Sequence, residues 1–510
     1  MSNNSEKKVL LSVKNLKKYF PVAKRKLFQK EQYYVHANES ITLDIYEGET
    51  LGLVGESGCG KSTFGRTLIQ IYEQTEGTTL YYGETMAAMA PAYVKKVIKK
   101  IPQLVSAYQV AAKERDEMVA AHAKMEAGLD KDSLAEKIMF KNREIENKYL
   151  NMARIAGGLL CSDDLNAVSA ELLEVYELQV VVAKNSKRIH RLQTKLADAE
   201  QAAKMDVEKA KAEIEQLSAE NTKQEAVIAE KQAALEEKRA ALKDRPLFEV
   251  YEECRDEGVD LSQLTEEEMR VLRKDMQFIF QDPYSSLDTK MTVGQIVGEG
   301  VLGHKIFKSS HGEAYNEYIQ GVMKQCGLDP YFIHRYPHQF SGGQRQRIGI
   351  ARALALKPKF IVCDESVSAL DVSIQSQVIN LLQDLKEEHK LTYLFITHDL
   401  SVVKYISDRI GVMYLGHIVE LSETENIFDD PQHPYTQALL AAIPRTDVED
   451  QELSILEGDI PSTVHPPSGC KFHTRCPIAN ETCKKFEPAL KEYKPGHFVA
   501  CHMVKAADEE

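Results

Sequence analysis

The chain has 510 residues, of which 43% are hydrophobic, so it can bury a large core and build more than one domain. Its formal net charge of −13, without a strong basic block, argues against nucleic acid as a partner. No run approaches the ~18 consecutive apolar residues of a transmembrane helix, and the N-terminus lacks the apolar core of a signal peptide. We therefore expect a cytoplasmic chain whose membrane role depends on partners.

Residues 55–63, GESGCGKST, fit the phosphate-loop pattern G-x-x-x-x-G-K-[ST]. The apolar run at 51–54 predicts a buried strand before this loop, and a helix is expected from Thr63 onward. Backbone N–H groups of such a loop wrap phosphates, aided by the positive end of the helix. Lys61 would reach the β- and γ-phosphates, and the Ser62 hydroxyl would ligate Mg²⁺. The alternative is a glycine-rich turn that binds no nucleotide. The predicted nucleotide contacts are Gly55, Ser57, Gly58, Cys59, Gly60, Lys61, Ser62 and Thr63.

A long helical segment follows the phosphate loop. Residues 103–245 contain no proline and only three glycines, which favours unbroken helices. From Leu192 to Leu242 apolar residues recur at spacings of three and four, a heptad pattern with a four-residue slip near Asp206. Three polar residues fall on the same seam and would weaken it: Asn221, Gln224 and Lys231.

Glycines suggest where this segment turns. The pair at 157–158, followed by Ser-Asp-Asp at 162–164, predicts the end of one helix and the N-cap of the next. We therefore predict an antiparallel helical hairpin, a coiled coil, with its apex near 157–163 and a second arm over 164–243. Its first arm would be interrupted around 128–130. Separate charged helices or partial disorder are the alternative.

Two further apolar runs predict buried strands that end in polar residues. The run at 360–363 would deliver Asp364 and Glu365 to the carboxyl end of a parallel strand. Asp364 suits Mg²⁺, which prefers oxygen ligands. Glu365 could orient or deprotonate an attacking water, although adjacent acids at a strand end can also be merely solvated. The run at 394–396 places His398 at a similar strand end.

The order of these motifs resembles that of ATP-binding cassette (ABC) ATPases. Their signature motif is similar to SGGQ at 341–344, which is followed here by RQR. The resemblance implies that Gln281, in FIFQDP, is the lid glutamine that contacts Mg²⁺ and the attacking water. It also implies that His398 is the switch histidine that reads the γ-phosphate. Ser366 departs from the family, which usually has proline after the catalytic glutamate, but no reacting group is lost.

The same resemblance implies that one chain supplies only half of each ATP site. In the family the signature residues contact the γ-phosphate bound by a second subunit, so this chain would act as half of a dimer. Residues 368–371 correspond to the D-loop, which ends at Asp371. Phe20 occupies the place of an aromatic residue that stacks on adenine, with Tyr19 as the fallback. The signature residues concerned are Ser341, Gly342, Gly343 and Gln344.

A coiled coil inside an ABC ATPase also suggests a chromosome-organising or DNA-repair ATPase. In those proteins the coiled coil leaves the head after the lid glutamine, whereas the helical segment here precedes Gln281. They also carry a C-x-x-C hook at the apex, where this chain has Cys161 alone. The stretch 291–340 has room only for a small helical subdomain.

The C-terminal tail resembles that of the oligopeptide/dipeptide permease ATPases, most closely the second ATPase subunit of oligopeptide importers. The resemblance rests on PPSGCKFHTRCPIANETCKKFEPAL and GHFVACH, with HPYTQALLAAIP upstream. Cysteine crowding in a cytoplasmic protein argues against disulfides. The spacing lacks the C-x-x-C knuckle of structural zinc, and some family members hold a [4Fe–4S] cluster on matching cysteines, so we expect that cluster. Zinc and free reduced thiols are the alternatives. The four cysteines are Cys470, Cys476, Cys483 and Cys501.

The sequence thus predicts an α/β ABC-type nucleotide-binding domain, a RecA-like lobe plus a helical lobe, interrupted by the hairpin and extended by a small Cys-rich region. The expected function is an ATPase that powers oligopeptide import, using ATP and Mg²⁺, at the cytoplasmic face of the membrane. A chromosome-type ATPase and an importer of another substrate such as nickel are the alternatives. The predicted divisions are 1–87 and 263–430 for the ATPase domain, 88–262 for the insertion and 431–510 for the extension.

The expected partners follow from the resemblance. They are a second ABC ATPase subunit that completes a heterodimer, two integral-membrane permease subunits and an extracytoplasmic solute-binding protein, with no nucleic acid. The segment after Gln281 would couple the ATPase to the permeases. The hairpin could dock an unidentified partner.

Overall fold

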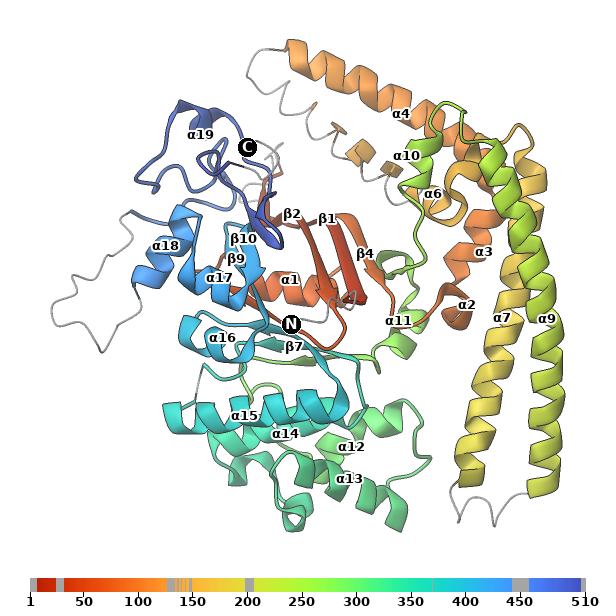
Figure 1. Cartoon of the computed structure of the whole chain (residues 1–510). Helices are drawn as coiled ribbons and strands as arrows, with labels where there is room; N and C mark the ends of the chain where they lie inside the picture. The colour runs from red at the N-terminus through yellow and green to blue at the C-terminus, as the bar shows by residue number, and fades with distance from the viewer. Residues whose placement is uncertain are drawn as a thin grey trace. The chain divides into compact units, whose positions relative to one another are not determined.

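A computed structural model of the chain describes residues 7–23, 32–125, 134, 137–138, 140–142, 144–145, 149–197, 206–368, 370–442 and 458–505. The chain forms two compact units (Figure 1). The first unit combines Met1–Thr75 with Glu266–Glu510, and the second is the continuous stretch Glu76–Thr265. The stretch Glu76–Thr265 therefore interrupts the first unit.

An eight-stranded sheet forms the centre of the first unit, in the order β11-β12-β10-β9-β3-β8-β7-β6. Strands β6, β7, β8, β3 and β9 are parallel neighbours. Parallel strands are covered on both faces, and this explains why β3, β7 and β8 are buried apolar runs. The strands predicted at 51–54, 360–363 and 394–396 are confirmed. The bounds are β3 (Thr50–Val54), β6 (Met276–Ile279), β7 (Phe360–Asp364), β8 (Thr392–Ile396), β9 (Arg409–Tyr414), β10 (His417–Glu423), β11 (Lys491–Lys494) and β12 (His497–Val499).

Helices and one β-hairpin complete the first unit. Strands β1 (Val9–Pro21) and β2 (Tyr34–Tyr46) pair antiparallel with several register shifts. Helices α12, α13 and α14 pack on one another and form a helical lobe, with buried residues that join the main core. The helices are α1 (Lys61–Leu68), α11 (Glu266–Leu272), α12 (Val293–Gly303), α13 (Glu313–Gln325), α14 (Gly342–Leu354), α15 (Val372–His389), α16 (Leu400–Ile406), α17 (Thr424–Asp429), α18 (Pro434–Ala441) and α19 (Glu481–Lys485).

The second unit begins and ends in two paired strands. Strand β4 (Glu76–Tyr81) pairs antiparallel with β5 (Val259–Asp260), so the chain enters and leaves this unit at adjacent points. A helical core with its own buried apolar cluster lies between them in the sequence. Its helices are α2 (Met86–Met89), α3 (Ala92–Lys99), α4 (Ile101–Lys124), α6 (Asn151–Ala156), α7 (Leu165–Ala197), α9 (Val207–Ala241) and α10 (Phe248–Glu252).

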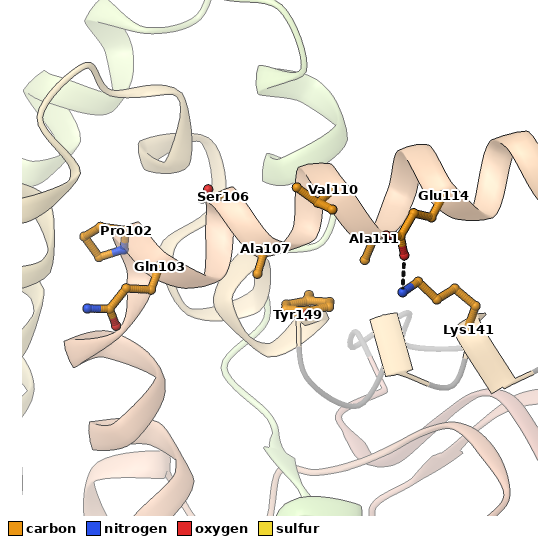
Figure 2. Close-up of a pocket in the computed structure, with 9 residues that line it drawn as sticks. All are labelled: Pro102, Gln103, Ser106, Ala107, Val110, Ala111, Glu114, Lys141 and Tyr149. Carbon is orange, nitrogen blue, oxygen red and sulfur yellow. Dashed lines mark ion pairs between the residues drawn. The ribbon is translucent and has the colours of Figure 1, made fainter.

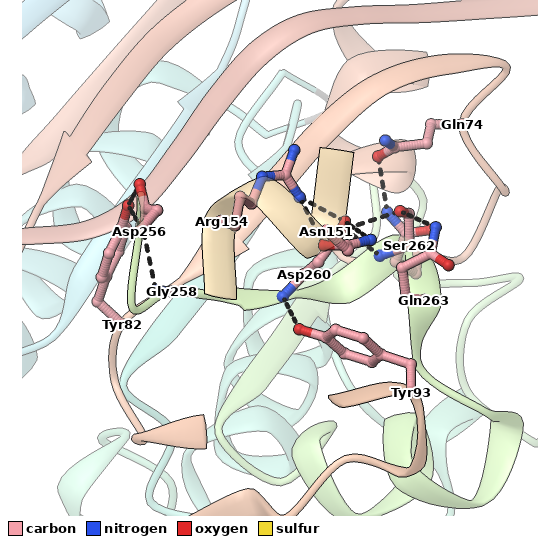
Figure 3. A network of polar contacts seen from close by, with 11 residues as sticks. Gln74, Tyr82, Tyr93, Asn151, Arg154, Asp256, Gly258, Asp260, Ser262 and Gln263 are labelled. Atoms are coloured by element: carbon pink, nitrogen blue, oxygen red, sulfur yellow. Dashed lines mark hydrogen bonds and ion pairs between the residues drawn. The ribbon is translucent and has the colours of Figure 1, made fainter. Parts of the chain in front are cut away.

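A buried polar network ties helix α6 to strand β5 (Figure 3). The Asp260 carboxylate is buried, pairs with Arg154 Nη1 at 2.7 Å and accepts a hydrogen bond from Asn151 Nδ2 at 3.2 Å. The Asp260 backbone N–H donates to the Tyr93 hydroxyl at 3.0 Å. Because removing one member of a buried ion pair costs about 3–5 kcal/mol, this network fixes the base of the second unit.

Helices α7 and α9 run antiparallel and side by side (Figure 1). Arg188 on α7 pairs with Glu213 on α9 at 2.8 Å, and farther along the pair Glu174 meets Lys231 at 2.8 Å. The α7 partner number falls as the α9 number rises, which fixes the antiparallel direction. The predicted seam faces inward: the buried residues of α9 include Ala210, Asn221, Ile228 and Leu235.

The predicted hairpin with its apex near 157–163 is wrong, because the two helices that pair, α7 and α9, both lie within the predicted second arm. Residues Gly157–Cys161 form a buried 3-10 helix, and a Cβ at Gly158 would come within 2.1 Å of the Phe248 ring. The glycine pair therefore permits close packing in the core and is not the tip of a hairpin. The arm predicted over 164–243 is two helices, α7 and α9, joined by the segment from 198 to 206. The predicted interruption at 128–130 lies outside the described residues.

The four-residue slip in the heptad pattern, near Asp206, coincides with the start of α9. Asp206 is the N-cap of α9, and its carboxylate accepts a hydrogen bond from the Lys209 backbone N–H at 3.0 Å. An aspartate at this position is a common helix start signal. Within the described part of the chain, no helix combines the length and the apolar character needed to cross a membrane.

Candidate active site

The phosphate loop connects β3 to α1 and lies close to neighbouring backbone. Gly55 has φ of +150°, and a Cβ there would lie 2.1 Å from the Met413 carbonyl oxygen. Gly60 has φ of +103°, and a Cβ there would lie 2.0 Å from the Ala37 carbonyl oxygen. Only glycine fits these two positions, which lets the loop curve tightly at the carboxyl end of β3.

Lys61 brings a positive charge into this loop. Its side chain is buried, and Nζ donates hydrogen bonds to the carbonyl oxygens of Gly55 at 2.7 Å and Glu56 at 3.0 Å. Cys59 is also buried, and burial raises the pKa of its thiol although Lys61 opposes that change. Of the other predicted contacts, Ser57 and Gly58 are exposed, whereas Thr63 is half-buried at the start of α1.

Two predicted magnesium ligands from distant segments meet at the end of β7. Ser62 Oγ donates to Asp364 Oδ1 at 2.5 Å, and Asp364 is fully buried. Burial raises the pKa of Asp364, whereas Ser62 and Arg66 lower it. A hydroxyl and a carboxylate are oxygen donors of the kind Mg²⁺ prefers, so these residues fit such an ion.

Arg66 is a residue of this site that the sequence analysis missed. Its Nη2 atom lies 3.3 Å from Asp364 Oδ2, so Arg66 holds the oxygen that Ser62 does not contact. The available signal was its position four residues after Ser62 on α1, which places both side chains on one helix face.

The three predicted catalytic residues come together at Glu365. Gln281 Nε2 donates to Glu365 Oε2 at 2.6 Å, and His398 Nδ1 lies 3.3 Å from Glu365 Oε1. The Glu365 side chain is 15% exposed, so water can reach it. Its backbone φ is +44°, a conformation that non-glycine residues seldom adopt and that is concentrated at functional sites. Ser366, the departure from the family pattern, is buried beside it.

The signature residues lie at the N-terminus of α14. Ser341 and Gln344 form a reciprocal capping box: Gln344 N donates to Ser341 Oγ at 3.4 Å and Ser341 N to Gln344 Oε1 at 3.1 Å. Ser341 and Gly342 are exposed, whereas Gly343 is buried. Asp371 is the exposed N-cap of α15, and Ala369 of the predicted D-loop lies outside the described residues. An exposed helix N-terminus favours an anion from outside the chain.

Of the two aromatic residues predicted to stack on adenine, Phe20 is more exposed than Tyr19. Tyr19 is buried, and its hydroxyl donates to Glu39 at 2.5 Å. Phe20 is half-buried, meets Tyr72 edge to face at 5.4 Å and has Lys18 Nζ 4.8 Å from its ring centre.

Two of the four tail cysteines, Cys470 and Cys483, are in contact. Cys470 N donates to the Cys483 carbonyl oxygen at 2.8 Å. Burial raises the pKa of the Cys470 thiol to about 11; a backbone hydrogen bond from Phe472 opposes this rise, and the nearby Cys483, Cys501 and Cys476 add to it. Within the described ranges, however, no three or more Cys, His, Asp or Glu side chains are arranged to hold a metal ion. The structure therefore gives no support for an iron–sulfur cluster.

A separate cavity of about 680 Å³ lies along α4 in the second unit (Figure 2). Its two charged side chains, Glu114 and Lys141, pair with each other at 2.6 Å. Because these two charges neutralise each other, this cavity offers no unpaired charged side chain for catalysis among its described lining residues, and the candidate active site is the one at the phosphate loop. The other lining residues are Pro102, Gln103, Ser106, Ala107, Val110, Ala111 and Tyr149.

Two family models match this chain. The family model described as "ABC transporter" matches residues 38–241 and 250–368. The model "Oligopeptide/dipeptide transporter, C-terminal region" matches residues 419–483.

Individual relatives match about half of this chain. The "Oligopeptide transport ATP-binding protein AppF" of Bacillus subtilis is 52% identical over 250 residues, which cover 48% of this chain and 75% of that protein. The "Oligopeptide transport ATP-binding protein OppF" of Escherichia coli is 51% identical over 250 residues, which cover 48% and 74%. A solved dimeric ATP-binding cassette bound to ADP and Pi aligns over 81% of this chain and 99% of its own, with 17% identity and a TM-score of 0.42.

Proposed function

This chain belongs to the ABC transporter ATPases of the oligopeptide/dipeptide permease family, and we propose that it powers the import of oligopeptides through a membrane transporter. The observation that carries the proposal is the meeting of Ser62 with Asp364, and of Gln281 and His398 with Glu365, beside the phosphate loop. The match of the tail to the oligopeptide/dipeptide transporter C-terminal region disfavours the chromosome-type alternative.

The residues of the candidate active site have distinct roles in the proposed ATP hydrolysis. Lys61 and the loop N–H groups bind the phosphates, and Ser62 and Asp364 hold Mg²⁺, which neutralises phosphate charge when bound. Glu365 orients and deprotonates the attacking water. Gln281 and His398 contact the two carboxylate oxygens of Glu365 and so hold it in position. Phe20 stacks on adenine, with the remaining loop residues around the phosphates.

The proposed assembly is a heterodimer of two ABC ATPase subunits. Ser341, Gly342, Gly343 and Gln344 contact ATP held by the partner, and Asp371 lies in the D-loop between the subunits. Two permease subunits hold the pair at the cytoplasmic face of the membrane, and a solute-binding protein delivers the peptide. The exposed start of α14 supports this arrangement, because its dipole favours an anion brought by the partner.

For the tail we propose a [4Fe–4S] cluster on Cys470, Cys476, Cys483 and Cys501, with zinc as the alternative. The proposal rests on the resemblance of the tail to family members that hold such a cluster on matching cysteines, which would bind it as thiolates. Protein purified without oxygen should contain about four iron atoms per chain. Replacing Cys483 by serine should remove the metal. Wild-type protein that contains neither iron nor zinc would exclude both groups.

We propose that the division at 1–87, 88–262, 263–430 and 431–510 reflects functional parts. In this division α7 and α9 form a coiled coil that docks another protein. The inward-facing heptad residues and the opposite charges between the helices support a stable helix pair.

The test of function is uptake of labelled tri- to hexapeptides by cells that carry either the wild-type chain or Glu365→Gln. The variant should bind ATP, remain as a closed dimer and lose uptake, because general-base catalysis contributes about 10²–10⁴-fold to such rates. Arg188→Gln, a change on the surface of α7, is the matched control and should transport normally. Equal uptake by wild type and Glu365→Gln, with both expressed, would reject peptide import driven by this site.

A further inference from the structure

The C-terminal extension contacts the phosphate loop through one ion pair. Arg475 lies between Cys470 and Cys476, and its two terminal nitrogens bond both carboxylate oxygens of Glu56 at 2.8 and 3.0 Å. Glu56 is the second residue of the phosphate loop. The Arg475 side chain is 4% exposed and that of Glu56 23%, so solvent screens this pair only weakly. Two-point Arg–carboxylate pairing of this kind also fixes geometry.

A second contact holds the backbone of the same residue. The Glu56 N–H donates to the Tyr435 hydroxyl at 2.9 Å. The Tyr435 ring packs on Phe472 at 5.4 Å, and Phe472 is almost completely buried. Phe472 and Arg475 belong to one turn, in which Arg475 N donates to the Phe472 carbonyl oxygen at 3.0 Å. The segment from Cys470 to Cys476, which we call the cysteine loop, thus binds the Glu56 side chain through Arg475. Through Phe472 it also packs on Tyr435, whose hydroxyl binds the Glu56 backbone.

The charge of Glu56 makes this contact relevant to ATP. Its carbonyl oxygen accepts a hydrogen bond from Lys61 Nζ, the group expected to meet the phosphates. A carboxylate in a phosphate-binding loop repels a polyphosphate unless a cation neutralises it. Arg475 supplies that cation, because its guanidinium is always charged and pairs with Glu56 at 2.8 Å.

We propose that the cysteine loop is a control element of the ATP site. Arg475 acts as a positioning residue that fixes and neutralises Glu56, so a change at the cysteines changes the affinity for ATP. This inference rests on the proposed ATP binding but is independent of which metal, if any, the cysteines hold.

The first test measures the ATP dissociation constant of the full-length chain by titration. Arg475→Gln should weaken ATP binding on the order of tenfold, within the usual range of coupling between sites. It should weaken ADP binding less, because ADP carries less charge, and it should raise KM for ATP more than it lowers kcat. The double variant Arg475→Gln with Glu56→Gln should bind within about threefold of wild type, because no uncompensated carboxylate remains.

The matched control is Arg409→Gln, which breaks a buried ion pair with Glu49 (3.2 Å) at the opposite end of β3 from the phosphate loop. That variant should lower the melting temperature without a selective loss of ATP affinity. Wild-type affinity in Arg475→Gln, or no recovery in the double variant at an equal melting temperature, would overturn the role of Arg475. A wild-type chain that fails to bind ATP would instead refute the proposed function.

The second test asks whether the cysteines affect ATP binding through Arg475. Cys476→Ser should weaken ATP binding in the wild-type background but add little in the Arg475→Gln background, because coupled changes are not additive. Equal losses in both backgrounds would overturn the link between the cysteines and the ATP site. Circular dichroism of each variant separates loss of binding from loss of folding.

Discussion

Glu365 and Asp364 are adjacent in the chain but differ in backbone strain and in burial. Glu365 adopts a positive φ directly after β7, where its N–H still donates to the Ile396 carbonyl oxygen at 2.9 Å. That bond and the contacts with Gln281 and His398 hold the strained residue in place. Asp364, one residue earlier, is fully buried. Successive side chains of a strand point to opposite faces, so the two carboxylates have different partners.

His433 gives a residue-scale prediction about pH. Burial lowers its pKa to about 4, although the nearby Glu420 opposes this shift. Nδ1 accepts the Tyr435 N–H at 3.1 Å, which a neutral ring permits. As the pH falls, His433 is therefore protonated near pH 6.5 in the unfolded chain but only near pH 4 in the folded chain. The free energy of unfolding is unaffected by His433 above pH 6.5 and decreases between pH 6.5 and 4, by about 3 kcal/mol at most.

Denaturant unfolding at a series of pH values checks this expectation. The free energy of unfolding of His433→Asn should fall less steeply between pH 6.5 and 4 than that of the wild type. His338→Asn, a change at an exposed histidine, should follow the wild type. Parallel curves for wild type and His433→Asn would show that His433 is not the responsible group.

At the scale of elements, α7 and α9 show how a polar residue sits in an apolar seam. Asn221 is buried, and its Nδ2 atom donates to Ser186 Oγ at 3.1 Å and to the Val182 carbonyl oxygen at 3.4 Å. Both partners lie on α7, so the bonds favour one register of the pair. A polar residue at such a position specifies register at a cost in stability.

Replacing Asn221 by leucine should stabilise the helix pair by about 1–2 kcal/mol, because apolar area replaces a polar group. Ile228→Ala, at a buried position of the same seam, should destabilise it by about 2–4 kcal/mol. Hydrogen exchange of peptides from α7 and α9 should be slower in the first variant and faster in the second. Faster exchange in Asn221→Leu would mean that Asn221 contributes net stability.

At the scale of the whole molecule, the second unit is an insertion with adjacent ends. Because β4 pairs with β5, residues 84–255 can be replaced by a short linker that leaves the two strands as a hairpin. Asp256 remains in that variant and keeps its bond to the Tyr82 hydroxyl at 2.8 Å. We expect ATP hydrolysis to stay within a few-fold of wild type, since the residues around Glu365 and Asp364 all belong to the first unit.

Peptide uptake and co-purifying proteins then report on the docking role of α7 and α9. Loss of a specific co-purifying protein, with hydrolysis intact, would support the docking arm. Unchanged uptake together with unchanged co-purifying proteins would reduce the unit to a passive addition. A variant in which α7 and α9 are each shortened by one heptad is the control, and it tests whether the length of the helix pair matters.

The sequence by itself determined the phosphate loop, three strands of the parallel sheet and the family, because each depends on residues close together in the chain. It also located the seam of α9, since heptad spacing is a local property. It did not determine that Gly157 and Gly158 are buried, because a glycine pair serves equally for a turn and for close packing. Only the tertiary structure paired Arg475 with Glu56, which lie 419 residues apart. No local pattern connects such residues, and the contact exists because the extension folds back against β9 and the phosphate loop.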